Sequence, residues 1–316
     1  MFHTCEINDH ANEKRSDGAA ICGRMLYLKD EIEKAATYLK TRTKYRPKIA
    51  MMCDSEFVFL GDYLEENEEF LFSTIPNFPK YTDENRTGKL IFGKLSQIPV
   101  LYMQGSLYLY EGNPLWKCTL PIRIIKELGI EVIITITKAR GINKSYQIGD
   151  IMFVEDHIDL VRLFGHFSLR GTKEELCHFE YSPVNRIYDK NFLEKSVEIG
   201  VNMGLEDHIH KGIYTYTMGP NLESNADDRL LKVMGSDAVG NTIVHEAIVA
   251  KHCGIDVIGL CVITSSCIIE YEDEEGIDQN KEFTVGNELE EILKKLVGKI
   301  VEYVNETKFK NFQFGS

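Results

Sequence analysis

The sequence has no apolar run that approaches the roughly 20 residues needed to cross a bilayer. Its first residues, 1–6 (MFHTCE), continue with charged side chains and lack the apolar core of a secretory signal. Basic residues are also scarce, since 36 Lys and Arg stand against 49 Asp and Glu, giving a net charge of −13. This balance argues against nucleic acid or an anionic membrane as a partner. A small anionic ligand stays compatible, because it needs only a local group of donors.

The cysteines form no C-x-x-C pair. The eight cysteines are scattered along the chain, and several lie in apolar runs such as 51–53 (MMC) and 260–262 (LCV). This pattern is typical of buried, reduced thiols rather than of a disulfide framework. We therefore expect a cytoplasmic protein.

The general motifs of nucleotide, hydrolase and metal sites are also missing. The sequence has no G-x-G-x-x-G, no P-loop, no G-x-S-x-G and no zinc-ligand spacing. His208 and His210 could form a metal pair, but no acid or cysteine beside them completes a site, so we interpret them as a surface pair. The acidic run 270–275 is typical of a solvated loop. These residues therefore give no indication of a metal site.

The order of apolar patterns predicts a single α/β domain with a mixed β-sheet flanked by helices. Residues 1–24 are polar and aperiodic and are interpreted as a flexible leader, and residues 25–316 as the domain. Short apolar runs predict strands over 48–53, 90–92, 100–104, 132–137, 151–154, 213–217 and 257–264. Helical spacing predicts helices over 28–43, 120–128, 189–203, 227–234, 243–252 and 288–304. The alternation of the two kinds of element favours one α/β unit.

A set of specific strings is more informative than these general patterns. In chain order they are 75–79 (IPNFP), 103–105 (MQG), 110–117 (YEGNPLWK), 149–152 (GDIM), 156–158 (DHI), 169–171 (LRG), 237–240 (DAVG) and 249–254 (VAKHCG). In this order and spacing the chain resembles the purine nucleoside phosphorylases of the trimeric, animal type. The resemblance extends from about residue 34 to about residue 304.

The resemblance implies a homotrimer with a site near each subunit interface. It implies purine nucleosides or bases as ligands, and cleavage of inosine and guanosine by inorganic phosphate to the free base and ribose 1-phosphate. Phosphate would be the co-substrate, and no metal or cofactor would take part. Such a site needs a pre-organised anion pocket, donors to the ribose and groups that stabilise charge on the purine.

The resemblance implies a phosphate site, but this chain keeps only some of the residues of that site. Four residues match phosphate-side positions and keep or supply a donor: Ser55, Arg86, Lys138 and Thr242. Five residues depart from the family pattern there: Asp54, Glu56, Ser106, Tyr108 and Arg140. Asp54 and Glu56 replace glycines of the phosphate loop, and Ser106 replaces a phosphate-clamping arginine. One carboxylate 4 Å from an anion costs on the order of 4 kcal/mol at an effective dielectric constant of about 20.

The nucleoside side is mixed as well. Tyr110 matches a ribose-contacting tyrosine and Glu223 the purine-binding glutamate, while Ser265 and Asn241 replace other purine-side residues. Gln279 replaces a ribose-side histidine, and Cys177 replaces a phenylalanine that the adjacent subunit usually contributes. Framework strings thus persist while residues of the pocket differ.

Three functions follow from this pattern. In the first, favoured here, the chain is a purine nucleoside phosphorylase-like protein with an eroded phosphate site, weakly active or inactive, that binds a purine or nucleoside or regulates an active relative. In the second, Arg86, Lys138 and Arg140 rebuild the anion site of an active phosphorylase of nucleoside metabolism. In the third, Asp54 or Glu56 orients water in a nucleoside hydrolase.

Overall fold

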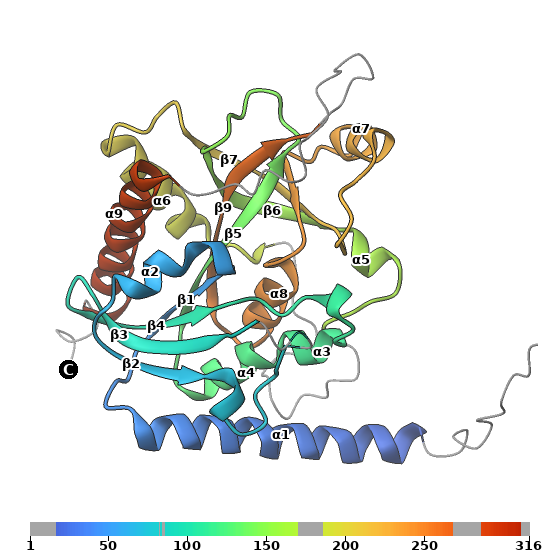
Figure 1. Cartoon of the computed structure of the whole chain (residues 1–316), viewed down its shortest axis with the longest axis vertical. Coiled ribbons are helices and arrows are strands. Elements are labelled where there is room, and N and C mark those ends of the chain that lie inside the picture. The colour runs from blue at the N-terminus through green and yellow to red at the C-terminus, as the bar shows by residue number, and fades with distance from the viewer. Residues whose placement is uncertain (1–16, 82, 84–85, 170–185, 268–285, 311–316) are drawn as a thin grey trace, which may run out of the picture.

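The first helix is longer than the sequence predicts. A computed structural model describes residues 17–81, 83, 86–169, 186–267 and 286–310 (Figure 1). Helix α1 (Asp17–Arg42) begins eleven residues before the predicted start at 28, so residues 17–24 of the expected leader are helical. Ile32, Ala35 and Leu39 on it are at most 1% exposed and pack into the core. The division of the chain at residues 24 and 25 stays a prediction.

The centre of the described chain is a mixed nine-stranded sheet in the order β2-β3-β4-β1-β5-β8-β7-β6-β9. The strands are β1 (Ile49–Cys53), β2 (Glu65–Leu71), β3 (Lys89–Leu95), β4 (Ile98–Gln104), β5 (Val132–Gly141), β6 (Ile151–Asp159), β7 (Ile209–Tyr216), β8 (Ala238–Gly240) and β9 (Asp256–Ser266). Strands β4, β1 and β5 run parallel, so the C-terminal ends of β4 and β1 lie side by side at the same end of the sheet. All seven predicted strands are present.

One half of the sheet closes on itself. Strand β5 pairs with both β8 and β9, and β9, β6, β7 and β8 pair in turn. These five strands therefore form a ring beside the open part made by β1 to β4 (Figure 1). The end of β5 lies where the ring and the open part meet.

Helices cover both faces of the sheet (Figure 1). One face packs under α1, α4 (Leu120–Glu127) and α8 (Val244–His252), whose buried residues share one core cluster. The other face packs under α2 (Val58–Asp62), α6 (Lys190–Asn202) and α9 (Asn287–Val304). The remaining α-helices of the described residues are α3 (Leu115–Cys118), α5 (Leu160–Leu163) and α7 (Asn225–Val233). The predicted α/β domain with a mixed sheet between helices is confirmed.

Strand β2 was not predicted, because its sequence (EENEEFL) is acidic and mostly exposed. It is an edge strand, and two of its glutamates form ion pairs with lysines of the neighbouring strand β3. Glu69 pairs with Lys89 and Glu66 with Lys94, both at 2.7 Å. Charged edge strands are common because they resist pairing with other chains.

In the described part of the chain, no helix combines the length and apolar character needed to cross a membrane. Cys53, Cys118, Cys253 and Cys261 are buried free thiols, as the sequence predicts, and Cys267 is a partly buried free thiol.

Candidate functional site

Asp54 directly follows β1, next to the C-terminal end of β4 and alongside β5. Its backbone N–H donates to Ile136 O of β5 at 3.2 Å, and Gly105 N–H donates to Cys53 O at 2.9 Å, which joins the segments after β1 and β4. The Asp54 side chain is 2% exposed. Its backbone is extended (φ −63°, ψ 163°), a conformation open to any residue. Asp54 is therefore enclosed between the ends of β1 and β4 and the middle of β5.

Hydroxyl groups surround this carboxylate. Ser106 Oγ donates to Oδ1 at 2.7 Å, and Thr137 Oγ1 donates to Oδ2 at 2.5 Å. Thr137 Oγ1 also lies 2.6 Å from Thr242 Oγ1, and the Lys138 N–H lies 3.4 Å from Oδ2. Burial raises the pKa of Asp54, and the hydrogen bond from Thr137 opposes this rise. The donors of this pocket are thus directed at a carboxylate of the chain itself.

The second carboxylate of the segment, Glu56, pairs with Lys138. The two side chains are in direct contact, 27% and 47% exposed. Burial lowers the pKa of Lys138, but the hydrogen bond and ion pair with Glu56 outweigh burial, so the pKa is raised overall. Ser55, a predicted phosphate donor, is exposed in the short 3-10 turn Ser55–Phe57, and its Oγ lies 3.3 Å from Glu56 Oε2. Neither Ser55 nor Lys138 directs its side chain to the Asp54 pocket.

Arg86 is held between aromatic rings and a carboxylate. It forms an ion pair with Glu111 and donates from Nη2 to Ser106 O at 3.3 Å. Its guanidinium carbon lies 4.2 Å from the Tyr81 ring centroid and 5.0 Å from that of Tyr108. Burial raises the pKa of Tyr81 to about 12. Arg86 is therefore committed to groups of the chain.

Arg140 is buried. It lies on β5 and is 8% exposed, because β5 continues past the predicted strand 132–137 to Gly141. Its Nη1 donates to Glu223 Oε2 at 2.6 Å and its Nη2 to Asp228 Oδ2 at 2.8 Å. Burial raises the pKa of Asp228, and Arg140 opposes this rise. The predicted purine-binding carboxylate is thus paired with an arginine.

Two of the remaining nucleoside-side residues, Tyr110 and Asn241, lie next to Gly219. A Cβ at Gly219 (φ +65°) would lie 2.9 Å from Asn241 Nδ2 and 3.3 Å from a ring carbon of Tyr110. Tyr110 is 36% exposed and stacks on Tyr108 at 4.9 Å between ring centroids. Ser265 stands opposite Arg140 in the β5–β9 register. Tyr110 and Asn241 therefore meet at Gly219, while Glu223 and Ser265 are neighbours of Arg140.

Two predicted residues lie outside the described part of the chain, namely Cys177 and Gln279. His208 and His210 do meet an acid, contrary to expectation, because Asp150 accepts from both at 2.9 and 2.7 Å. His208 is 58% exposed and His210 21%. Within the described ranges no group of three metal-ligating side chains could hold a metal ion.

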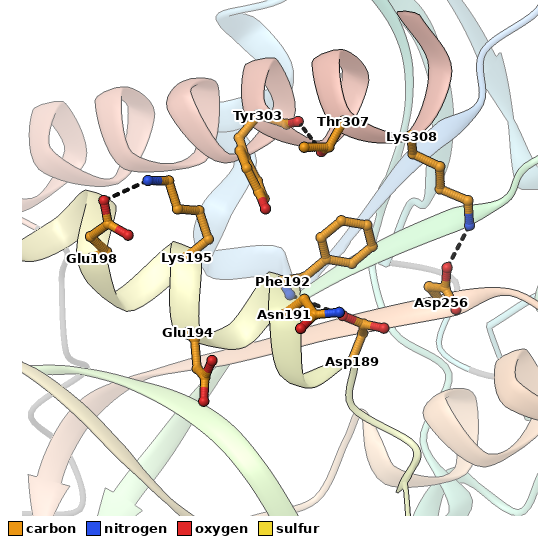
Figure 2. A pocket seen from close by; sticks show the side chains of 10 residues that line it. All are labelled: Asp189, Asn191, Phe192, Glu194, Lys195, Glu198, Asp256, Tyr303, Thr307 and Lys308. Carbon is orange, nitrogen blue, oxygen red and sulfur yellow. Dashed lines mark hydrogen bonds and ion pairs between the residues drawn. The ribbon is translucent and has the colours of Figure 1, made fainter. Parts of the chain in front are cut away.

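A cavity of about 590 Å³ lies elsewhere, between α6 and α9. Figure 2 shows its aromatic side chains, Phe192 and Tyr303, and two ion pairs, Lys195–Glu198 and Lys308–Asp256. Its lining includes none of the predicted site residues.

Known proteins share this fold and much of the sequence. The family model of the phosphorylase superfamily matches residues 48–302. A purine nucleoside phosphorylase of Anopheles gambiae is 36% identical over 279 residues, 88% of this chain and 79% of that protein. One of Mus musculus is 34% identical over 275 residues, 87% of this chain and 95% of that protein. The chain belongs to the purine nucleoside phosphorylase family.

Solved structures of the purine nucleoside phosphorylase family agree with this assignment. A Schistosoma enzyme in complex with hypoxanthine superposes with a TM-score of 0.81 at 30% identity, over 86% of this chain and 96% of that one. Isoform 2 of the Schistosoma mansoni enzyme, in complex with cytosine and ribose-1-phosphate, gives a TM-score of 0.82 at 29% identity.

The predicted site of this family member separates into two groups. Asp54, Ser106 and Thr242 come together in one hydroxyl-lined pocket, while Arg86, Lys138 and Arg140 each turn to a different carboxylate. Sequence reasoning missed three partners: Thr137, Glu111 and Asp228. Glu111 lies within the string 110–117 and Thr137 at the end of the predicted strand 132–137, whereas nothing in the sequence marks Asp228 as a partner of Arg140.

Proposed function

We propose that this family member binds a purine or a purine nucleoside and catalyses little or no phosphorolysis. The observation that carries the proposal is the pairing of its three candidate phosphate cations. Arg86 pairs with Glu111, Lys138 with Glu56, and Arg140 with both Glu223 and Asp228. A phosphate dianion would have to compete with these carboxylates for every one of the three cations.

The cost of that competition differs among the pairs. Lys138 and Glu56 are partly exposed, so their separation costs little. Arg140 lies between two carboxylates and its side chain is 9% exposed, so removing it from them leaves charges buried without a partner. Ser106 cannot replace an arginine, because a hydroxyl carries no charge and cannot bind two oxygens side by side. These groups support weak or absent use of phosphate.

The proposed ligand class comes from the relatives and from the geometry. Schistosoma relatives are described in complex with hypoxanthine, adenosine and inosine. In this chain Tyr110 and Asn241 lie together beside Gly219, and Glu223 keeps its place on Arg140. We propose that a purine ring lies among these residues and shares Glu223 with Arg140.

The hydrolase alternative is less well supported. A general base needs a free oxygen facing the water that it orients. Asp54 is 2% exposed and both of its oxygens accept hydroxyl hydrogen bonds. Glu56 is already bound to Lys138.

The test combines binding with turnover. Equilibrium dialysis of labelled inosine and guanosine against the full chain measures binding, and chromatography of the same samples measures base release. The proposal predicts saturable binding with the nucleoside recovered intact, whether phosphate is present or not. Rapid phosphate-dependent release of base, or no binding of either nucleoside or of hypoxanthine, would contradict it.

We extend the proposal to a cytoplasmic homotrimer, in line with the resemblance and the reduced thiols. Sedimentation equilibrium of the full chain checks the assembly. A mass of one subunit at micromolar concentration would contradict it.

A further inference from the structure

The pocket around Asp54 has the composition of a site for an oxyanion. It combines three hydroxyl groups, on Ser106, Thr137 and Thr242, with the backbone N–H of Lys138. They come from three separate segments, namely the turn after β4, the middle of β5 and the turn before α8. Ser106, Thr137 and the Lys138 N–H converge on the Asp54 carboxylate, and Thr242 is linked to it through Thr137. Converging donors bind anions, because each places a partial positive charge on the same point.

The occupant of this pocket is a side chain of the protein. Asp54 is 2% exposed, and each of its oxygens accepts at least one hydroxyl hydrogen bond. Thr137 Oγ1 completes a chain of short contacts, from Asp54 Oδ2 at 2.5 Å to Thr242 Oγ1 at 2.6 Å. A hydrogen-bonded carboxylate presents two oxygens and a negative charge, as one edge of a phosphate does.

We propose that Asp54 is a built-in anion that fills the hydroxyl pocket and excludes inorganic phosphate from it. This inference rests on the proposed function and gives it a cause located in one side chain. Two effects act together. The carboxylate takes the donors that a phosphate would use, and its negative charge repels a second anion at close range.

Three further charged groups lie near the pocket and do not reverse this effect. Glu56 contributes a second negative charge, and Lys138 is paired with it. Arg86 faces the ring of Tyr108 and is paired with Glu111. Asp54, Glu56 and Lys138 together therefore carry a net negative charge while Asp54 is ionised.

The backbone permits a direct test by substitution. Because Asp54 has an extended conformation, alanine and asparagine can replace it without backbone strain. Asp54→Ala removes the occupant and leaves the hydroxyl donors in place. Asp54→Asn removes the charge and keeps the shape, which covers the case in which the alanine variant fails to fold. Asp62→Asn, at an exposed carboxylate at the end of α2, is the matched control.

The measurement is the affinity of the full chain for inorganic phosphate, by titration calorimetry without nucleoside and against sodium chloride at matched ionic strength. We expect Asp54→Ala or Asp54→Asn to bind phosphate at least about tenfold more tightly than the unchanged chain. Asp62→Asn should behave like the unchanged chain. The inference is overturned if the unchanged chain already binds phosphate as tightly as these variants, or if the folded variants bind it no better. Because no nucleoside is present, this result is independent of whether the chain binds or cleaves nucleosides.

Discussion

Ser106 Oγ donates a 2.7 Å hydrogen bond to Oδ1 of Asp54, which links the end of β4 to the end of β1. Both positions depart from the family pattern, and the two departures are chemically matched. A hydroxyl at 106 satisfies the acid at 54, and the acid takes the donor that would otherwise face solvent or ligand. The changes at this site therefore form an interaction instead of a set of independent losses.

Replacing Thr137 by valine in the presence of Asp54 should destabilise the fold by more than the same change in an Asp54→Asn background. Hydrogen bonds to charged groups contribute about 1.5–3 kcal/mol, so the double-mutant cycle should give a coupling free energy of about 2 kcal/mol. Thr119→Val is the matched control, since Thr119 is also buried but bonds to Leu115 O at 3.0 Å. Denaturant unfolding of the unchanged chain, the single variants and the double variants measures the free energies of both cycles. Equal coupling free energies of Asp54 with Thr119 and with Thr137 would disagree with the proposed network.

Arg140→Met should lower the free energy of unfolding by about 3–5 kcal/mol, because it leaves Glu223 and Asp228 without their cation in a mostly buried place. Lys48→Met is the control, because the Lys48–Glu131 pair is 51% and 39% exposed and should contribute less than about 1 kcal/mol. Urea unfolding of both variants makes the comparison. Similar small losses at both positions would show that Arg140 is not a structural ion-pair partner.

Glu246→Gln should change the pH dependence of stability. Burial raises the pKa of Glu246 to about 7 from 4.5. Between those values the folded state holds more protons than the unfolded state, so stability falls as pH rises, by at most about 1.4 kcal/mol per pH unit. The glutamine variant lacks this loss, and its stability relative to the unchanged chain should rise from pH 5 to pH 7.

His245 gives the opposite sign and serves as the control for this prediction. Burial lowers the pKa of His245 to about 4 from 6.5, so its effect is a loss of stability as pH falls through that window. His245→Gln should therefore gain relative stability toward acid, whereas Glu246→Gln gains toward neutral pH. Thermal unfolding over pH 4.5–7.5 separates the two, and parallel profiles for both variants would contradict the account.

The fold could be predicted largely because its strands are apolar and its helices keep a regular spacing. Val132 to Ile136 and the stripe of α9 carry that signal directly. Strand β2 could not be predicted, since its acidic residues are stabilised by lysines of β3 that lie about twenty or more residues away in sequence. The continuation of β5 through Arg140 was missed because Lys138 and Arg140 interrupt the apolar run on which the strand prediction rests.

The site was predictable as a set of positions and not as a set of contacts. Sequence alone placed Asp54, Ser106 and Thr242 on the phosphate side, and the structure brings them together. It could not show that Arg140 would bind Glu223 and Asp228, because that choice depends on how β5 faces α7. A cation can pair with any acid within reach, and only three-dimensional packing decides which.

The account is tested most directly by release of purine base from inosine and guanosine with and without inorganic phosphate, beside an active family enzyme. We predict little or no phosphate-dependent release by the unchanged chain under conditions in which the active enzyme converts its substrate completely. Phosphate-dependent turnover at a rate comparable to that enzyme would mean that Arg86, Lys138 and Arg140 leave their carboxylates to bind phosphate, and the central claim would be wrong.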